Sequence, residues 1–427
     1  MQENRATPSD EADRIPDERI REWKRTLDPQ TMWPETTHRD RLAAYQDIFT
    51  ATARVLRGEP AFLSMKEPAL VRAAGVVAFV SGTGPLLGRW VERGHLRASA
   101  PLAVLLADHL AHGRRRADEM GLRFARVAQA LAGRGIVPTV LKGTYTARRY
   151  FEEPGVRLTS DIDVLVSRDE YPSACDALRS LGLRPLSPHA LPYRQEWGPG
   201  EEQVVRSVEM SHADSPWTID LHTTLDRGYF GLVAGFGTPD QSMMEPWTGP
   251  FGTVRVPAQP LLAAHLAVHA SADFPHLHLI HAVELILVLR ADLASGRLGW
   301  GALADLLGHT GTRRFAFPGF ALAERLVPGL VKAEFLDALT RSATPRMRRT
   351  FPDAVLVPPQ HFPGLSLDMR LAWAKGPLQI ATNIFDWLYP TGPEMSAMSR
   401  FRVLWRRLRL LVSGRVGWRS TKAGPRT

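Results

Sequence analysis

Cysteine is almost absent from this chain of 427 residues, and its single example, Cys175, excludes any disulfide within the chain. Disulfide-free chains are typical of reducing compartments, so we expect a cytoplasmic protein. Long apolar runs are absent as well, and even Ala73–Val80 is too short to cross a bilayer. The opening Met1–Asp13 is polar and lacks the apolar segment of a signal peptide. We therefore expect a globular protein with no membrane span.

Acidic residues are missing from the C-terminal end. From Arg400 to Thr427 the chain carries nine Arg and Lys residues and no Asp or Glu, which equals the net charge of +9 for the whole chain. The rest is therefore close to neutral, so a nucleic-acid partner is not favoured. A helix predicted at Phe401–Val412 has an apolar stripe with arginines beside it. Two interpretations stay open for this helix, packing on the domain or contact with anionic lipid or RNA.

Composition and periodicity divide the chain into five regions. We expect a mobile polar arm at 1–40, an N-terminal helical lobe at 41–130, a core with strands at 131–235, a C-terminal helical lobe at 236–395, and a basic terminal helix and tail at 396–427. The predicted fold class is α+β or α/β, with a small mixed sheet between the two helical lobes.

Two acidic residues lie within the apolar run Thr159–Val166. Side chains of a strand alternate between its faces, so Asp161 and Asp163 project together while Ile162 and Val164 enter the core. Such paired acids repel each other unless a cation lies between them, and Mg²⁺ is commonly held by carboxylates and substrate phosphates. The pattern predicts a metal-dependent phosphoryl- or nucleotidyl-transfer site. An isolated Asp-x-Asp is more often a solvated strand edge, and only its surroundings change that balance.

Two further features strengthen the transfer interpretation. Lys142-Gly143-Thr144 forms a turn between a strand predicted at Ile136–Leu141 and a helix that Thr144 can cap, where backbone N–H groups favour phosphate. Asp220 lies on a strand predicted at Trp217–His222, so a third carboxylate comes from another strand. Three acids beside a phosphate-binding turn suit transfer with two metal ions, in which positioning and charge neutralisation carry the rate. A strand is also predicted at Val204–Met210, and a helix at Ala117–Ala132.

These residues resemble a known family. Leu141-Lys142-Gly143, then Tyr150, Arg157, Asp161–Val166 and finally Ile219-Asp220-Leu221-His222 are similar to the motifs of the uncharacterised nucleotidyltransferase family, part of the DNA polymerase β-like superfamily. The likeness covers about residues 100–290 and continues more weakly to about 400. It implies a small mixed sheet flanked by helices, two Mg²⁺ ions and an NTP substrate. Relatives in bacterial gene clusters for modified peptides suggest a role in peptide natural-product biosynthesis.

The resemblance also assigns roles to individual residues. It implies that Asp161, Asp163 and Asp220 are the catalytic metal ligands, and that Lys142, Gly143, Thr144 and Arg157 contact the nucleotide phosphates. His222 and Ser160 would hydrogen-bond the ligands from outside. Alternatives without a catalytic role stay open. Arg157 could pair with Glu152 or Glu153 at the surface, and Asp220 could face solvent. His265 and His269 have the spacing of zinc ligands on a helix, but the accompanying Glu and Cys are lacking, so core or surface histidines are favoured. His269 also matches a family position, which implies a place at the rim of the site.

The leading hypothesis is therefore an enzyme that moves NMP from an NTP, taken as ATP, to a hydroxyl or phosphate of an acceptor. The acceptor is a small molecule, a peptide or a protein, and the sequence specifies neither it nor the oligomeric state. Two rival hypotheses are a non-catalytic binding module with a degenerate transferase fold and an RNA-end modifying enzyme guided by the basic tail.

Overall fold

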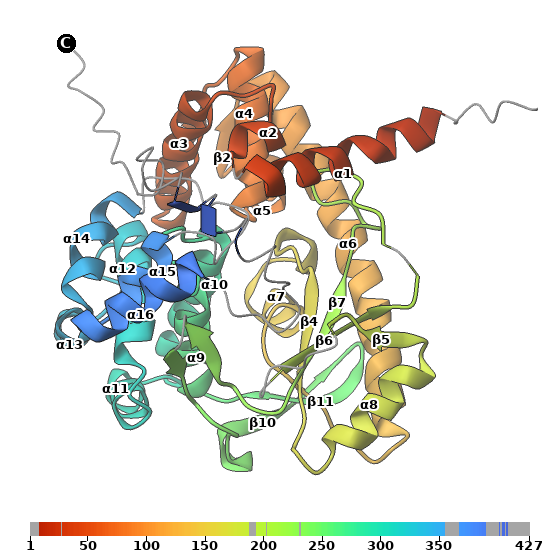
Figure 1. The fold of residues 1–427 in the computed structure, drawn as a ribbon, viewed down its shortest axis with the longest axis vertical. Helices are drawn as coiled ribbons and strands as arrows, with labels where there is room; N and C mark the ends of the chain where they lie inside the picture. The colour runs from red at the N-terminus through yellow and green to blue at the C-terminus, as the bar shows by residue number, and fades with distance from the viewer. Residues whose placement is uncertain are drawn as a thin grey trace, which may run out of the picture.

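A mixed sheet lies at the centre of the computed structural model, with helices from the two ends of the chain around it (Figure 1). The structure describes residues 8–26, 28–187, 194–201, 203–229, 232–354 and 367–389, together with 401, 404, 405, 407 and 408. This is the α+β architecture expected from the sequence. The helix predicted at Phe401–Val412 lies mostly outside the described residues.

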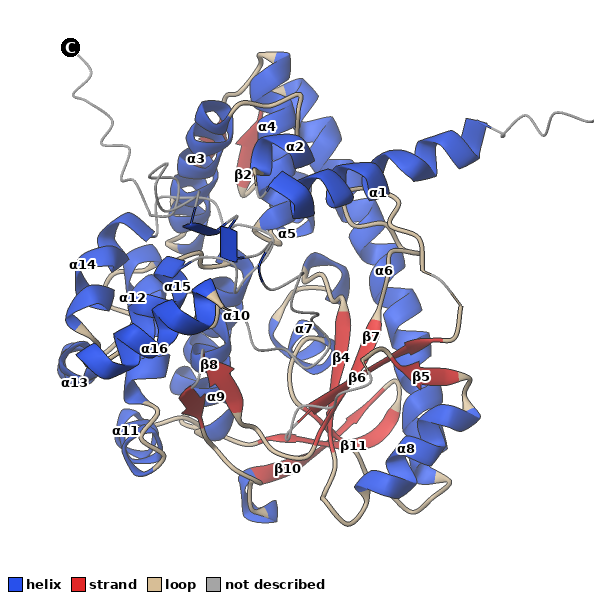
Figure 2. Ribbon diagram, viewed as in Figure 1, coloured by secondary structure: helices blue, strands red, loops and turns tan. Residues whose placement is uncertain are grey.

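The central sheet has seven strands in the order β10-β11-β3-β4-β7-β6-β5 (Figure 2). In that order they are β10 (Met244–Gly249), β11 (Gly252–Pro257), β3 (Thr139–Val140), β4 (Asp161–Leu165), β7 (Thr218–His222), β6 (Arg194–Pro199) and β5 (Leu183–Pro185). β4 and β7 are parallel neighbours, whereas β3 pairs antiparallel to β4 and β6 pairs antiparallel to β7. The two acidic strands predicted from the sequence therefore form, and they lie side by side.

One face of the sheet is closed by apolar packing. Its inward residues Ile162, Val164, Ile219 and Leu221 are at most 1% exposed. They belong to one core cluster with the apolar stripe of α6 (Ala100–Ala132) and with residues of α8 (Tyr171–Ser180). Since burying each such side chain contributes about 1.5–3 kcal/mol, this face fixes the register of the strands. α6 begins well before the predicted Ala117, because Leu102, Leu106 and Leu110 extend the same stripe by three more turns.

The N-terminal region is helical. Its elements are α1 (Pro8–Thr26), α2 (Pro29–Met32), α3 (His38–Leu56), β1 (Ala61–Leu63), α4 (Pro68–Val80), α5 (Gly84–Glu92) and β2 (Leu96–Ala98). Residues 1–40 differ from the expected mobile arm, because most of them form α1 and α2. Trp23, Met32 and Trp33 are buried in one cluster, and Trp33 Nε1 donates a hydrogen bond to the carbonyl of Val208 at 2.8 Å. Three large apolar side chains thus anchor a segment that is otherwise polar.

The C-terminal region follows the helical pattern predicted after Pro257. It contains α9 (Leu261–Ala270), α10 (Leu279–Ala294), α11 (Trp300–His309), α12 (Arg313–Leu326), α13 (Ala333–Ser342), α14 (Pro345–Ala354), α15 (Leu367–Trp373) and α16 (Pro377–Leu388). Before it, β8 (Arg227–Tyr229) and β9 (Leu232–Ala234) form a hairpin, and α7 (Thr144–Tyr150) follows β3. The sheet extends to Pro257 rather than ending near residue 235, because β10 and β11 join its edge.

One strand prediction fails before β7. The segment predicted as a strand at Val204–Met210 has no strand in its described residues, and β5 and β6 take up the sheet edge instead.

Among the described helices, none alone has the length and apolar character needed to cross a membrane, and α4 and α5 satisfy that requirement only as a pair bent by 113°.

The burial of His109 predicts that acid lowers the stability of this fold. It lies on α6, is 1% exposed, and neither ring nitrogen has a hydrogen-bond partner within the described part of the chain. Burial, with the nearby His112 and His212, lowers the pKa of His109 to about 4. The unfolded chain therefore binds this proton first, and stability is lost as the pH falls from about 6.5 to 4.

We expect His109→Leu to remove this part of the pH dependence. Between pH 7 and pH 4.5, the unfolding free energy of the wild type should fall by about 2 kcal/mol more than that of the variant. Urea unfolding at the two pH values measures the difference. Equal losses in both proteins would show that His109 is protonated in the folded state at no cost.

Candidate active site

The parallel pairing of β4 with β7 brings the acids together. Asp163 lies directly opposite Asp220 in the ladder, and His222 lies opposite Leu165. Because side chains alternate along each strand, Asp161, Asp163, Asp220 and His222 all lie on the same face of the sheet, opposite the face packed by α6. Alternation along each strand predicted which way these side chains point, and the register of β4 with β7 places them next to one another.

Asp163, Asp220 and His222 form a group that could hold a metal ion. Each offers one ligand atom, and these atoms lie within 4.8 Å of one another. Asp163 is 5% and Asp220 3% exposed, so neither is a solvated strand edge. Among the described residues Asp220 Oδ1 has no hydrogen-bond partner, and coordination to a cation would satisfy this oxygen. Asp161 is more exposed and is not part of this group.

Lys142 is the counter-ion of the aspartate pair. Its Nζ contacts Asp163 Oδ2 and lies 3.5 Å from Asp161 Oδ2, although the lysine is only 6% exposed. The backbone positions it, since Leu141 N donates to the carbonyl of Asp163 at 3.2 Å. Burial would raise the pKa of Asp163, but Lys142 and a hydrogen bond from His222 hold that pKa well below its usual range. Burial would likewise lower the pKa of Lys142, but Asp161 and Asp163 raise it on balance.

Arg194 has the corresponding role at Asp220. This residue of β6 donates from Nη1 to Asp220 Oδ2 at 2.8 Å and from Nη2 to Glu196 at 2.9 Å. Even so, burial and the charges of Asp163 and Asp161 raise the pKa of Asp220 to about 7. Sequence reasoning missed Arg194, because the polar segment before Trp197 carries no alternation that predicts a strand.

Arg116 fixes the approach to both acidic strands. From α6 its guanidinium donates to the carbonyls of Thr159 at 3.1 Å and Pro216 at 2.8 Å. Thr159 precedes β4 and Pro216 precedes β7, so one buried arginine ties the two loops together. An arginine within a helix stripe gives no signal of this role in the sequence.

The turn 142–144 has the strained shape that a glycine permits. Gly143 adopts φ +59°, and a Cβ there would lie 3.4 Å from Thr159 Cγ2. The helix that follows, α7, has seven residues, and Thr144 Oγ1 is buried with no partner among the described residues. The predicted phosphate contacts of Lys142, Gly143 and Thr144 stay predictions.

Arg157 lies inside the protein and not at the surface. Its Nη2 donates to Glu284 Oε2 at 2.9 Å and its Nε to Glu284 Oε1 at 3.3 Å. Glu284 comes from α10, is fully buried, and also accepts a hydrogen bond from Thr146 on α7. The alternative pairing with Glu152 or Glu153 is wrong. Those two acids pair with other arginines, among them Arg89 and Arg114. The phosphate contact predicted for Arg157 stays a prediction.

The comparison with protein families agrees with this geometry. The model of a family described as uncharacterised nucleotidyltransferases matches residues 76–328, a span that includes all the residues above. The chain belongs to this family. A comparison with curated proteins finds no match. Nucleotidyl transfer uses a divalent ion. The buried carboxylates and the imidazole of this uncharacterised nucleotidyltransferase suit such an ion.

Ser160 and the histidines complete this nucleotidyltransferase site. Ser160 is exposed, and its carbonyl accepts a hydrogen bond from Thr218 N at 3.3 Å. Within the described residues, none of the helix histidines joins the potential metal group. Burial lowers the pKa of His265 to about 3, and the rings of His269 and His281 lie 4.4 Å apart. Burial also lowers the pKa of His269 and His281, and within the described residues these histidines lie outside the potential metal group.

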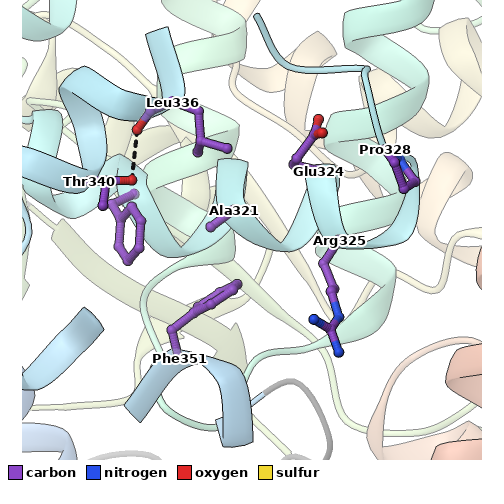
Figure 3. Close-up of a pocket in the computed structure, with 8 residues that line it drawn as sticks. Ala321, Glu324, Arg325, Pro328, Leu336, Thr340 and Phe351 are labelled. Carbon is purple, nitrogen blue, oxygen red and sulfur yellow. Dashed lines mark hydrogen bonds between the residues drawn. The ribbon is translucent and has the colours of Figure 1, made fainter. Parts of the chain in front are cut away.

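A separate hollow lies away from the nucleotidyltransferase site (Figure 3). Its volume is about 370 Å³, and α12, α13 and α14 line it with residues that include Phe317, Leu336 and Phe351. Besides the apolar side chains, Glu324, Arg325 and Thr340 line it, and the lining includes no aspartate. We assign it no role in the chemistry.

Proposed function

We propose that the protein is a metal-dependent nucleotidyltransferase. It moves NMP from an NTP, with ATP as the donor, to a hydroxyl or phosphate of an acceptor and releases pyrophosphate. The observation that carries this proposal is the buried pair Asp163–Asp220, aligned on parallel strands beside His222 and completed by an Asp220 oxygen that has no partner among the described residues. Membership of the nucleotidyltransferase family supports the same reaction.

The chain's residues divide the work in the following way. Asp163 and Asp220 would hold the metal, and Asp161, which is more exposed, would be a ligand of a second ion. A bound divalent ion stabilises negative charge on the oxygens of the triphosphate. Lys142 neutralises the aspartates in the metal-free protein and can turn to the phosphates when a metal ion replaces it. Gly143 and Thr144 contribute backbone and hydroxyl donors. The positioning of these groups accounts for most of the rate.

The test is transfer of label from an α-labelled NTP in an extract of the producing cell. We expect Mg²⁺- or Mn²⁺-dependent labelling of one class of molecule, and none with EDTA or with the Asp220→Asn variant. Calorimetry with NTP and metal distinguishes the rival hypothesis, because a non-catalytic binding module shows no metal-dependent affinity for the nucleotide. Label that RNase removes would identify an RNA-end modifying enzyme instead.

A further inference from the structure

We propose that His222 is itself a ligand of the metal, and that the site therefore binds Mn²⁺ in preference to Mg²⁺. This inference rests on the proposed function, since it concerns the same site, and it replaces the outside hydrogen-bonding role expected for His222. It also gives the site a nitrogen donor in place of a purely carboxylate ligand set.

The geometry places the imidazole among the ligands. His222 Nε2 lies 3.2 Å from Asp163 Oδ1 and faces it across the β4–β7 pair. Asp163 Oδ2 is bound by Lys142, so Oδ1 is the oxygen that faces the His222 ring. Asp220 is arranged in the same way, with Oδ2 bound by Arg194 and Oδ1 without a partner within the described chain. Each aspartate thus keeps one oxygen for the space that His222 also faces.

Nothing else in the described structure holds His222 in a donor state. Its Nδ1 is buried and has no hydrogen-bond partner among the described residues, so no carbonyl or carboxylate fixes the ring proton there or excludes it. A histidine that serves only as a hydrogen-bond donor would keep its proton on Nε2. Nε2 can offer its lone pair to an ion at Asp163 Oδ1 when the proton lies on Nδ1, a tautomer that no described residue excludes.

The resulting donor set distinguishes metals. Mg²⁺ strongly prefers oxygen ligands and keeps several waters, whereas an imidazole nitrogen suits more readily polarised ions. Mn²⁺ accepts carboxylates as Mg²⁺ does and binds a given nitrogen- and oxygen-containing site more tightly. Two carboxylate oxygens and one imidazole, with the remaining positions open to phosphates, therefore favour Mn²⁺.

Electron paramagnetic resonance of Mn²⁺ added to the full chain tests the inference directly. We expect the spin-echo modulation of bound Mn²⁺ to contain a nitrogen coupling that changes when histidine is isotopically labelled. The coupling should vanish in His222→Phe and persist in the matched control His265→Phe, whose ring is in the wall of the site but outside the ligand group. His222→Asn is a second variant that removes the imidazole, and the same loss of the coupling is expected there. Circular dichroism checks that each variant is folded.

Competition titrations give the second readout. We expect His222→Phe to weaken Mn²⁺ binding about 10- to 100-fold and Mg²⁺ binding less than about threefold. Bound Mn²⁺ without any nitrogen coupling in the wild type would overturn the inference and leave the proposed function standing. Equal weakening of both ions would also overturn it, because His222 would then act on the aspartates alone. A wild type that binds no divalent ion, even with NTP, would overturn the proposed function itself.

Discussion

Asp163→Asn and Asp220→Asn are both expected to abolish nucleotidyl transfer, yet to change stability in opposite directions. Asp163 is the close partner of the buried Lys142, whose other carboxylate neighbour among the described residues, Asp161, lies 3.5 Å away. Removing the charge of Asp163 leaves an ammonium group in a site that is shielded from water. Breaking a buried pair from one side costs about 3–5 kcal/mol, and we expect a loss near the lower end because Asp161 remains.

Ionisation of Asp220, unlike that of Asp163, destabilises the folded protein. Burial and the neighbouring Asp163 and Asp161 raise its pKa to about 7, so the ionised form is unfavourable in the folded protein without metal. A raised pKa contributes stability at low pH that is lost as the pH rises through about 7. Asn carries no such charge. Arg194, which loses Asp220, is partly exposed and still has Glu196 at 2.9 Å.

Urea unfolding with EDTA measures both variants. At pH 8 we expect Asp163→Asn to be about 3 kcal/mol less stable than the wild type, and Asp220→Asn to be as stable or more stable. The advantage of Asp220→Asn should shrink as the pH is lowered to 5. The double variant Lys142→Met/Asp163→Asn should recover most of the loss. Equal destabilisation by the two single variants would contradict the assignment of Lys142 to Asp163.

The position of the acids could be predicted because it depends on local patterns. Alternation along two short strands places Asp161, Asp163, Asp220 and His222 on the face that apolar packing leaves open. Any register that buries Ile162 and Ile219 turns these side chains the same way, so only the adjacency of β4 and β7 had to be supplied by the fold. The sequence also marked Lys142-Gly143-Thr144 as a turn, whereas the positive φ of Gly143 is a finding of the structure.

The partners of these residues could not be predicted, because they depend on packing between distant elements. Arg194 reaches Asp220 only through β6, the strand between β7 and the edge strand β5. The segment of β6 includes Gly198 and Pro199 and therefore looks like a loop. Arg116 and Glu284 are charged residues within helices that bury one face, and the sequence does not show which loop that face meets. The only signal for Glu284 was its place as a lone acid in the apolar run Ala282–Leu289.

Glu284→Ala is expected to cause the largest loss of stability of any variant considered, about 3–5 kcal/mol. Glu284 is fully buried and Arg157 is 6% exposed, so truncation leaves a buried guanidinium without its ion-pair partner, and only the weaker field of Asp161 and Asp163 remains. The pKa of Arg157 supports this, because burial alone would lower it and Glu284 raises it on balance. Thr146 on α7 would lose one of its two acceptors and keep the carbonyl of Gly143 at 3.3 Å. Urea unfolding at pH 7 measures the loss.

A double-mutant cycle separates the ion pair from simple packing. Arg157→Met/Glu284→Leu should regain most of the stability lost in either single variant, because apolar side chains of similar volume can replace a buried pair at little cost. Additive losses would show that the two side chains stabilise the fold independently. The same double variant tests the phosphate contact predicted for Arg157, since it is folded and lacks the guanidinium. If its affinity for NTP, measured by calorimetry, equals that of the wild type, Arg157 holds α10 against the loop before β4 and does not contact the triphosphate.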